Sequence, residues 1–227
     1  MQGFRCVRFL TVAVFAAAAV WAAPGAAAPP APPTAAPNPP ASSPGPYKGV
    51  YTVLKEPSAH TRGKVKMAEF ADFYCPHCHL FEQTVVPMLE EKFGDRIEIT
   101  MVGFPVIPGK LPTAFEMYEQ AKLMGKGPQM KRVLFRTIHK DRLHMLDRVI
   151  RESLEKEVGV DPAAFESGLA SGKPTKAFLE GRRWGEKIEV QQTPTVLLDG
   201  NIKVENLDPE NLKTVIQSIL DSDAAKR

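Results

Sequence analysis

The chain has 227 residues, 44% hydrophobic and 24% charged, which is the composition of a globular protein with room for one sizeable domain. Its 29 basic and 26 acidic residues give a formal charge of +3, and two of the basic residues, Arg5 and Arg8, lie in a segment that we expect to be removed. The remaining 27 basic and 26 acidic residues leave about +1, which gives no indication of a nucleic-acid partner.

Residues 1–22 have the pattern of a secretory signal peptide. Basic residues precede an apolar run over residues 9–20, and small residues that suit a signal peptidase follow it. We expect cleavage after Ala22, with Ala27 as the alternative site, and export to the periplasm. An uncleaved membrane anchor is the other reading, because the following alanines could lengthen a run that is short for the roughly 20 residues that cross a bilayer.

Removal of this segment also changes the cysteine content. Cys6 lies ahead of the apolar run, so it is badly placed for lipid attachment and is lost with the signal peptide. The exported chain then keeps only Cys75 and Cys78. A framework of structural disulfides is excluded, since this pair has no other cysteine to join.

A linker and then a β-α-β unit follow along the chain. Residues 23–46 are rich in proline and alanine and predict an extended linker without a fold, so the folded domain is expected over residues 47–227. Strands are predicted at 49–55, 64–74 and 96–102. A helix is predicted from about Cys75 to Phe93, with Pro76 in its first turn and Gly94 as its C-cap.

The hydrophobic period then becomes helical over about residues 111–185. Three apolar faces, the third containing Leu143, Leu146 and Ile150, predict an inserted lobe of three or four helices, with Asp161 as one N-cap. Residues 193–204 predict a hairpin that turns at Asp-Gly-Asn. The chain ends in an amphipathic helix with Asp208 as N-cap.

The motif CPHCH at residues 75–79 fits three chemistries, namely a redox dithiol, half of a zinc site and the attachment site of c-type haem. Its position favours the dithiol. Cys75 at the start of a helix meets unpaired backbone N–H groups and the positive end of the helix dipole, which favour a thiolate, and His77 adds to this effect. Cys78, one turn on and less exposed, is placed to form a disulfide with Cys75. A stable thiolate is a good leaving group, so the disulfide should be a strong oxidant.

The zinc and haem alternatives lack partners in the sequence. Zinc needs two further ligands, and His60, His139 and His144 are scattered, with only the last two at a usable spacing, so no metal is expected. Haem would use His79 as its axial ligand, yet the motif is the joint of a β-α-β unit. His79 is then expected to be an ordinary residue of the second helical turn, solvated or at the edge of the helix. No cofactor is expected.

The segment EFADFYCPHCHLFEQ resembles the active-site segment of DsbA-type thiol:disulfide oxidoreductases of the thioredoxin superfamily. YTVLKEP resembles their first strand, Thr193-Pro194 followed by TVLLDGN resembles their cis-proline loop and hairpin, and the helical lobe falls where these proteins insert one. The resemblance covers about residues 47–227. It implies an α/β thioredoxin fold with an inserted helical lobe.

The resemblance also implies roles for individual residues. Cys75, Pro76, His77 and Cys78 would form the redox centre, with Cys75 as the exposed nucleophile, Cys78 as the resolving thiol and His77 as the residue that tunes Cys75. Pro194 would be the cis-proline that faces the cysteines, and the Thr193 backbone would pair with a substrate peptide. Glu69 falls on the buried acid that is a proposed proton acceptor for Cys78. A strand residue that faces solvent is the alternative for Glu69.

The resemblance implies an exported enzyme that donates its disulfide to unfolded or reduced secreted polypeptides. A DsbB-like, quinone-linked membrane oxidase would reoxidise it, and it would act as a monomer, because the dimerisation domain of exported isomerases is missing. Thr193 departs from the valine of the best-known oxidases, which leaves open a periplasmic reductase or isomerase kept reduced by a DsbD-like donor. An electron carrier with c-type haem is the remote alternative.

Overall fold

The computed structural model describes residues 45–107, 113–144 and 147–225. The predicted signal peptide, and the predicted linker except for its last two residues, lie outside the described residues. The helices and strands, in chain order, are β1 (Tyr51–Val53), β2 (Val65–Ala71), α1 (Pro76–Phe93), the 3-10 turn η1 (Gly94–Arg96), β3 (Ile97–Gly103), α2 (Thr113–Leu123), α3 (Gly127–Arg136), the π-helical turn η2 (Thr137–Asp141), α4 (Arg148–Val158), α5 (Pro162–Ala170), α6 (Lys173–Lys187), β4 (Thr195–Leu198), β5 (Ile202–Val204) and α7 (Pro209–Ala225).

A five-stranded mixed sheet in the order β1-β5-β4-β2-β3 forms the centre of this unit. β2 and β3, which precede and follow α1 in the sequence, are parallel neighbours in the sheet, and this confirms the predicted β-α-β unit. The other neighbouring strands are antiparallel. β2 is an interior strand, as its apolar sequence predicts. The β4–β5 hairpin turns through Asp199 and Gly200, which both have positive φ (47° and 80°), as the Asp-Gly-Asn sequence indicates.

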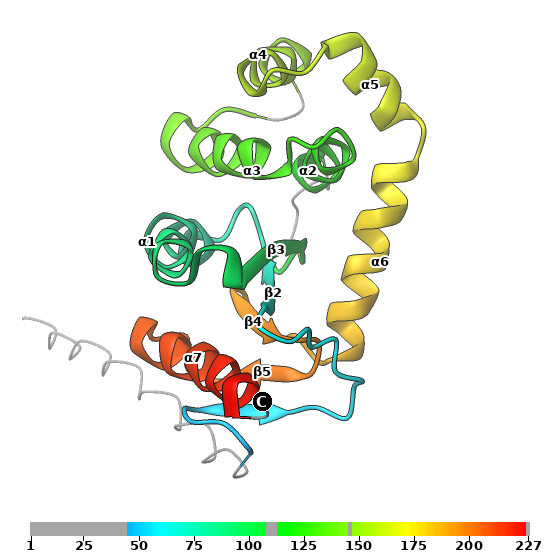
Figure 1. The fold of residues 1–227 in the computed structure, drawn as a ribbon. Coiled ribbons are helices and arrows are strands. Elements are labelled where there is room, and N and C mark those ends of the chain that lie inside the picture. The colour runs from blue at the N-terminus through cyan, green and yellow to red at the C-terminus, as the bar shows by residue number, and fades with distance from the viewer. Residues whose placement is uncertain (1–44, 108–112, 145–146, 226–227) are drawn as a thin grey trace, which may run out of the picture. The chain divides into compact units, whose positions relative to one another are not determined.

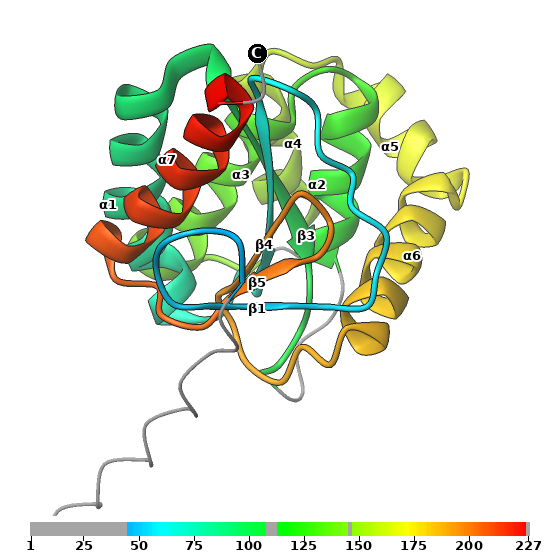
Figure 2. The ribbon, with the colours of Figure 1, turned by 60° about the horizontal axis from the view of Figure 1, so that its bottom comes forward.

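Helices cover both faces of the sheet, α1 and α7 on one and α6 on the other (Figures 1 and 2). The alternation along β2 explains this arrangement, because successive side chains of a strand point to opposite faces. Val65 and Met67 pack with α1 and α7, whereas Phe70 packs with Phe104 and Trp184 on the side of α6. Glu69 is two residues after Met67 and four after Val65, so its side chain points to the same face of the sheet, the face covered by α1.

The helices α2 to α6 form the inserted lobe, which has its own core. The described part of the lobe holds five α-helices, so the prediction of three or four was too low. The predicted face that contained Leu143 does not form one helix. η2 ends at Asp141, Arg142 after it is left-handed (φ 55°), and α4 begins only after Asp147. The Asp147 carboxylate caps α4 by accepting from the Val149 N–H at 2.8 Å. Leu146 lies outside the described residues.

The two cysteines belong to the core of the lobe rather than to the core between the sheet and α7. Phe73, Cys75 and Cys78 pack with the buried side chains of α2 and α3, including Phe115 and Phe135. The dithiol therefore lies where the lobe meets the sheet. Among the helices of the described residues, none has the length and apolar composition needed to cross a membrane.

Candidate active site

The turn between β2 and α1 presents the two cysteines. β2 ends at Ala71, three residues earlier than the sequence suggests, because Asp72 folds the chain into a turn. The Cys75 N–H donates to the Asp72 carbonyl oxygen at 3.0 Å. The Asp72 carboxylate accepts from the Tyr74 N–H and from the N–H groups of Val106 and Ile107, each at 2.9 Å. One buried side chain thus ties the turn to the segment that follows β3.

Cys75 is the N-cap of α1 with extended backbone angles, as predicted, and Pro76 occupies the first helical position. This places the Cys75 sulfur at the positive end of the helix. Both cysteines are buried, Cys75 with 5% and Cys78 with 0% of its surface exposed, so the expectation of an exposed Cys75 is wrong and Cys75 is only the less buried of the two. His77 is exposed between them.

The second cysteine is strongly affected by its burial. Burial raises the pKa of the Cys78 thiol far above its usual range, and the Thr193 side chain and the Asp72 backbone nearby offset only part of that rise. A thiol with so high a pKa holds its proton at neutral pH unless a base removes it. The structure therefore distinguishes a sulfur at the start of α1 from a fully buried one, which is an asymmetry that a nucleophile and a resolving thiol would require.

The Thr193–Pro194 loop lies against Cys75, although more than a hundred residues separate them in the sequence. The peptide bond between Thr193 and Pro194 is cis, which confirms the cis-proline predicted from the resemblance. The Cys75 thiol donates to the Thr193 carbonyl oxygen, with Sγ and O 3.4 Å apart. Pairing of β2 with β4 brings the two segments together, with Phe70 opposite Thr195.

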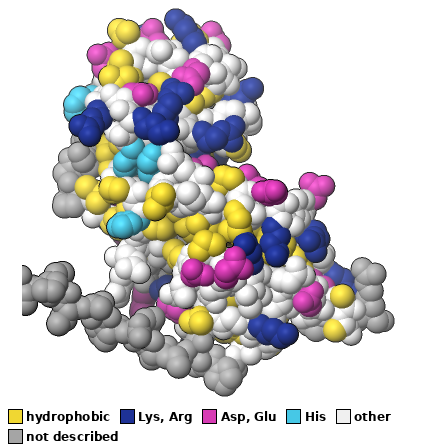
Figure 3. Space-filling view, turned by 90° about the vertical axis from the view of Figure 1, so that its left-hand side faces the viewer, with side chains coloured by type: hydrophobic (Ala, Val, Ile, Leu, Met, Phe, Trp, Pro, Cys, Tyr) yellow, Lys and Arg dark blue, Asp and Glu magenta, His cyan; other side chains and the backbone are white. Residues whose placement is uncertain are grey.

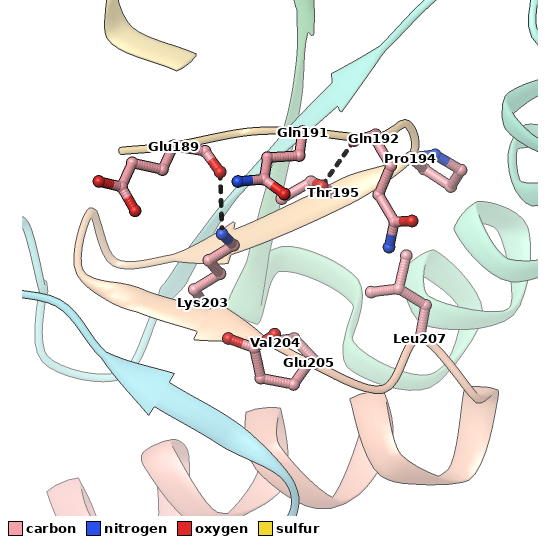
Figure 4. Close-up of a pocket in the computed structure, with 9 residues that line it drawn as sticks. All are labelled: Glu189, Gln191, Gln192, Pro194, Thr195, Lys203, Val204, Glu205 and Leu207. Carbon is pink, nitrogen blue, oxygen red and sulfur yellow. Dashed lines mark hydrogen bonds between the residues drawn. The ribbon is translucent and has the colours of Figure 1, made fainter. Parts of the chain in front are cut away.

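A pocket of about 470 Å³ adjoins this loop on the side of β5 (Figure 4). Its lining is largely polar and comes from the loop that precedes β4, from the start of β4, from β5 and from the segment that follows β5: Glu189, Gln191, Gln192, Pro194, Thr195, Lys203, Val204, Glu205 and Leu207. Two hydrogen bonds fix its wall, from Lys203 Nζ to the Glu189 carbonyl oxygen (3.3 Å) and from Thr195 Oγ1 to the Gln192 carbonyl oxygen (2.8 Å).

Glu69 is fully buried on β2, so the alternative of a solvent-facing side chain is wrong. Burial raises its pKa to about 8, against a smaller lowering by Lys131. The carboxyl group is therefore largely protonated at neutral pH. Lys131 of α3 forms an ion pair with Glu82 of α1 at 2.7 Å, and both side chains are 8% exposed.

Sequence reasoning missed Lys131, Glu82 and Asp72 as parts of this site. The position of Glu82 in the sequence could have indicated its role, because it lies four residues after Cys78 and so on the same apolar face of α1.

His79 also differs from its expected place. It is stacked on His139 of the lobe, with ring centroids 4.6 Å apart and planes at 5°, and so is more than an ordinary residue of the second turn. His144 lies beyond the end of η2 and does not share a helical face with His139.

Comparisons with known proteins agree with this geometry. The thioredoxin family model matches residues 60–218. The chain is 27% identical over 169 residues to the probable disulfide bond formation protein D of Bacillus cereus, covering 69% of this chain and 74% of that protein. It is 24% identical over 172 residues to the thiol:disulfide interchange protein DsbA of Burkholderia cepacia, covering 74% and 80%.

Solved structures show the same fold. The oxidoreductase DsbA from Xylella fastidiosa superposes with a TM-score of 0.64 at 19% identity, covering 77% of this chain and 95% of that one. DsbA from Pseudomonas aeruginosa gives 0.60 at 22% identity, covering 78% and 94%. The arrangement of the sheet and the inserted helices is thus a thioredoxin fold with a helical insertion.

Proposed function

Because this chain belongs to the thioredoxin family and is a DsbA-like thiol:disulfide oxidoreductase, we propose that it is exported to the periplasm and donates its Cys75–Cys78 disulfide to secreted proteins as they fold. The observation that carries the proposal is the asymmetry of the two sulfurs. Cys75 caps the start of α1 and its thiol donates to the Thr193 carbonyl oxygen, whereas Cys78 lies one turn further into the helix and is fully buried.

The exchange has two steps. A substrate thiolate attacks Cys75 Sγ, a mixed disulfide forms, and Cys78 leaves as a thiolate that takes up a proton. A second substrate thiolate then attacks the substrate sulfur of the mixed disulfide and expels the Cys75 thiolate. The substrate loses two electrons and gains a disulfide, and the enzyme is left as a dithiol. The positive end of α1 stabilises the departing Cys75 thiolate, and His77 in the same turn adds to this stabilisation.

Glu69 is proposed as the proton carrier for Cys78. Its carboxyl group holds a proton at neutral pH, because burial raises its pKa to about 8. It can therefore give this proton to the Cys78 thiolate when the mixed disulfide forms and take it back when the enzyme is reoxidised. The Glu82–Lys131 ion pair sets the charge around Glu69, since both residues act on it electrostatically.

The substrate is proposed to bind as an extended strand along the Thr193–Pro194 loop, with backbone hydrogen bonds to Thr193. The pocket beside Pro194 supports this role, because it lies at the end of such a strand and offers amide and carboxylate groups to a polypeptide (Figure 4). Backbone pairing suits an enzyme that accepts many unfolded sequences. We propose that the enzyme is a monomer and that a DsbB-like, quinone-linked membrane oxidase restores its disulfide.

The test uses single cysteine variants and a reduced model substrate. Cys75→Ser should abolish oxidation of the substrate, because no Cys75–Cys78 disulfide can form. Cys78→Ser, mixed with the disulfide form of the model substrate, should accumulate a mixed disulfide, because the Cys75 thiolate attacks the substrate disulfide, one substrate thiol leaves, and no resolving thiol remains. A Cys75→Ser protein that still oxidises the substrate would refute the assigned nucleophile. Export is tested separately, by expressing the full-length chain and recovering from the periplasm a product that lacks the predicted signal peptide.

A reductase or isomerase kept reduced by a DsbD-like donor is the second candidate, and Thr193 is the residue that favours it. Thr193 stands before the cis-proline, where the best-known oxidases of the resembling family have valine. The redox state of the chain in the periplasm separates the two directions, since an oxidase is found oxidised and a reductase reduced. A Soret band in the purified protein would instead favour the haem carrier, for which the His79 ring would have to leave its stack on His139.

A further inference from the structure

One side chain of the lobe reaches the turn that presents the cysteines. His139 belongs to η2, the π-helical turn that follows α3. Such turns are rare in proteins, and those that occur are often found at functional sites. Its Nε2 lies 2.8 Å from the carbonyl oxygen of Phe73, two residues before Cys75. A carbonyl oxygen only accepts, so Nε2 carries the hydrogen and donates it.

The imidazole of His139 is also held from the side. Its ring lies 4.6 Å from the ring of His79 at 5°, and His79 lies 5.9 Å from Phe135 at 29°. Phe135 in turn packs against Phe73, with ring centroids 4.9 Å apart. The four rings connect α3 and η2 of the lobe to the β2–α1 turn and to the second turn of α1. They belong to one packed unit, so the donor on His139 has a fixed position.

The β2–α1 turn is therefore held from two sides. The Asp72 carboxylate fixes it to the segment after β3, through the N–H groups of Val106 and Ile107. His139 fixes it to the lobe, through the Phe73 carbonyl. Figure 3 shows histidine side chains next to hydrophobic ones near the middle of the face that α1 and the lobe share.

We propose that His139 is a positioning residue of the redox site, which fixes the Phe73 carbonyl and through it the place of Cys75 Sγ at the start of α1, with His79 as its stacking partner. The effect differs between the two redox forms. In the disulfide form, the bond to Cys78 holds Cys75 in place whatever the turn does. In the reduced form, the Cys75 sulfur depends on the turn to stay near the unpaired N–H groups of α1 that stabilise its thiolate.

Loosening the turn should thus destabilise the reduced enzyme more than the oxidised one. In His139→Leu, we expect the equilibrium constant for oxidation of glutathione by the enzyme to fall by roughly three- to tenfold, the effect of one net hydrogen bond. The fraction of Cys75 present as thiolate at a given pH, followed by thiolate ultraviolet absorbance, should fall with it. His139→Gln keeps an amide donor for the Phe73 carbonyl and should recover most of both values.

His144→Leu is the matched control, since His144 is exposed beyond the end of η2, and it should behave as wild type. Equal glutathione equilibria and thiolate fractions in wild type and His139→Leu, with both proteins folded by circular dichroism, would overturn the proposal. If His139→Leu does not fold, the wild-type protein supplies the test. Nitrogen NMR of its imidazoles should show His139 as the Nε2–H tautomer, and an Nδ1–H tautomer would overturn the proposal. Neither test depends on export or on the direction of electron flow.

Discussion

Replacing Glu69 by glutamine should stabilise the protein, and by an amount that grows with pH. Burial raises the pKa of Glu69 from 4.5 to about 8, so between these values the unfolded chain releases a proton that the folded chain keeps. Stability is then lost as pH rises from about 4.5 to about 8. The loss is about 3 kcal/mol at pH 7 and about 5 kcal/mol above pH 8, at 1.36 kcal/mol for each pKa unit.

Glu69→Gln removes this loss because the amide does not ionise. Urea unfolding of the reduced protein should give equal free energies of unfolding for wild type and Glu69→Gln near pH 4.5, and a variant more stable by up to about 5 kcal/mol near pH 8.5. For a domain of this size, 3 kcal/mol raises Tm by roughly 6–12 °C. The exposed Glu98 on β3 provides the control, since Glu98→Gln should show no such pH trend. A difference between Glu69→Gln and wild type that is the same at both pH values would refute the reasoning.

Three further substitutions probe other parts of the fold, all by urea unfolding. Lys131→Met should cost about 3–5 kcal/mol, because it leaves the buried Glu82 carboxylate unpaired, and adding Glu82→Gln should recover most of that loss. The His60 ring lies between the carboxylates of Asp199, at 2.7 Å, and Asp223, at 2.9 Å. Hydrogen bonds to these carboxylates outweigh the effect of burial and raise the pKa of His60. Its contribution is therefore full in acid and lost as pH rises, so His60→Gln should cost about 2 kcal/mol at pH 5.5 and less at pH 9, and an equal cost at both would contradict this assignment. Gly185→Ala would place a Cβ 2.6 Å from two ring carbons of Phe104 and should cost about 1–3 kcal/mol unless α6 can move away from the sheet.

The sequence predicted those parts of the structure that local chemistry determines. The Cys75 N-cap, Pro76 and Gly94 define the ends of α1, and the Asp-Gly-Asn turn defines the β4–β5 hairpin. Asp161 caps α5 as expected, accepting from the Ala164 N–H at 2.8 Å. Each of these features depends on residues within a few positions of one another, so a single stretch of sequence contains them.

The parts that the sequence did not predict depend on contacts between distant elements. The Lys131–Glu82 pair joins α3 to α1, and the His139 contact with Phe73 spans 66 residues. A lysine in a helix is solvated far more often than buried, so its pattern alone gives no reason to expect a partner. The helices of the lobe were miscounted for a related reason. The left-handed Arg142 ends η2 and the Asp147 cap begins α4, and together they interrupt what reads as one apolar face.

The insertion of the lobe between β3 and β4 has a consequence for biosynthesis. β2 lies between β3, which follows it closely, and β4, which the ribosome adds only after all five helices of the lobe. Until Thr195–Leu198 has been made, one edge of β2 has no partner and the Thr193 carbonyl that meets Cys75 does not yet exist. A nascent chain therefore carries Cys75 without its Thr193 contact for about half of its synthesis, since 118 of the 227 residues are added after Cys75 and up to Thr193. The contact between Cys75 and Thr193 forms only when nearly the whole domain has been synthesised.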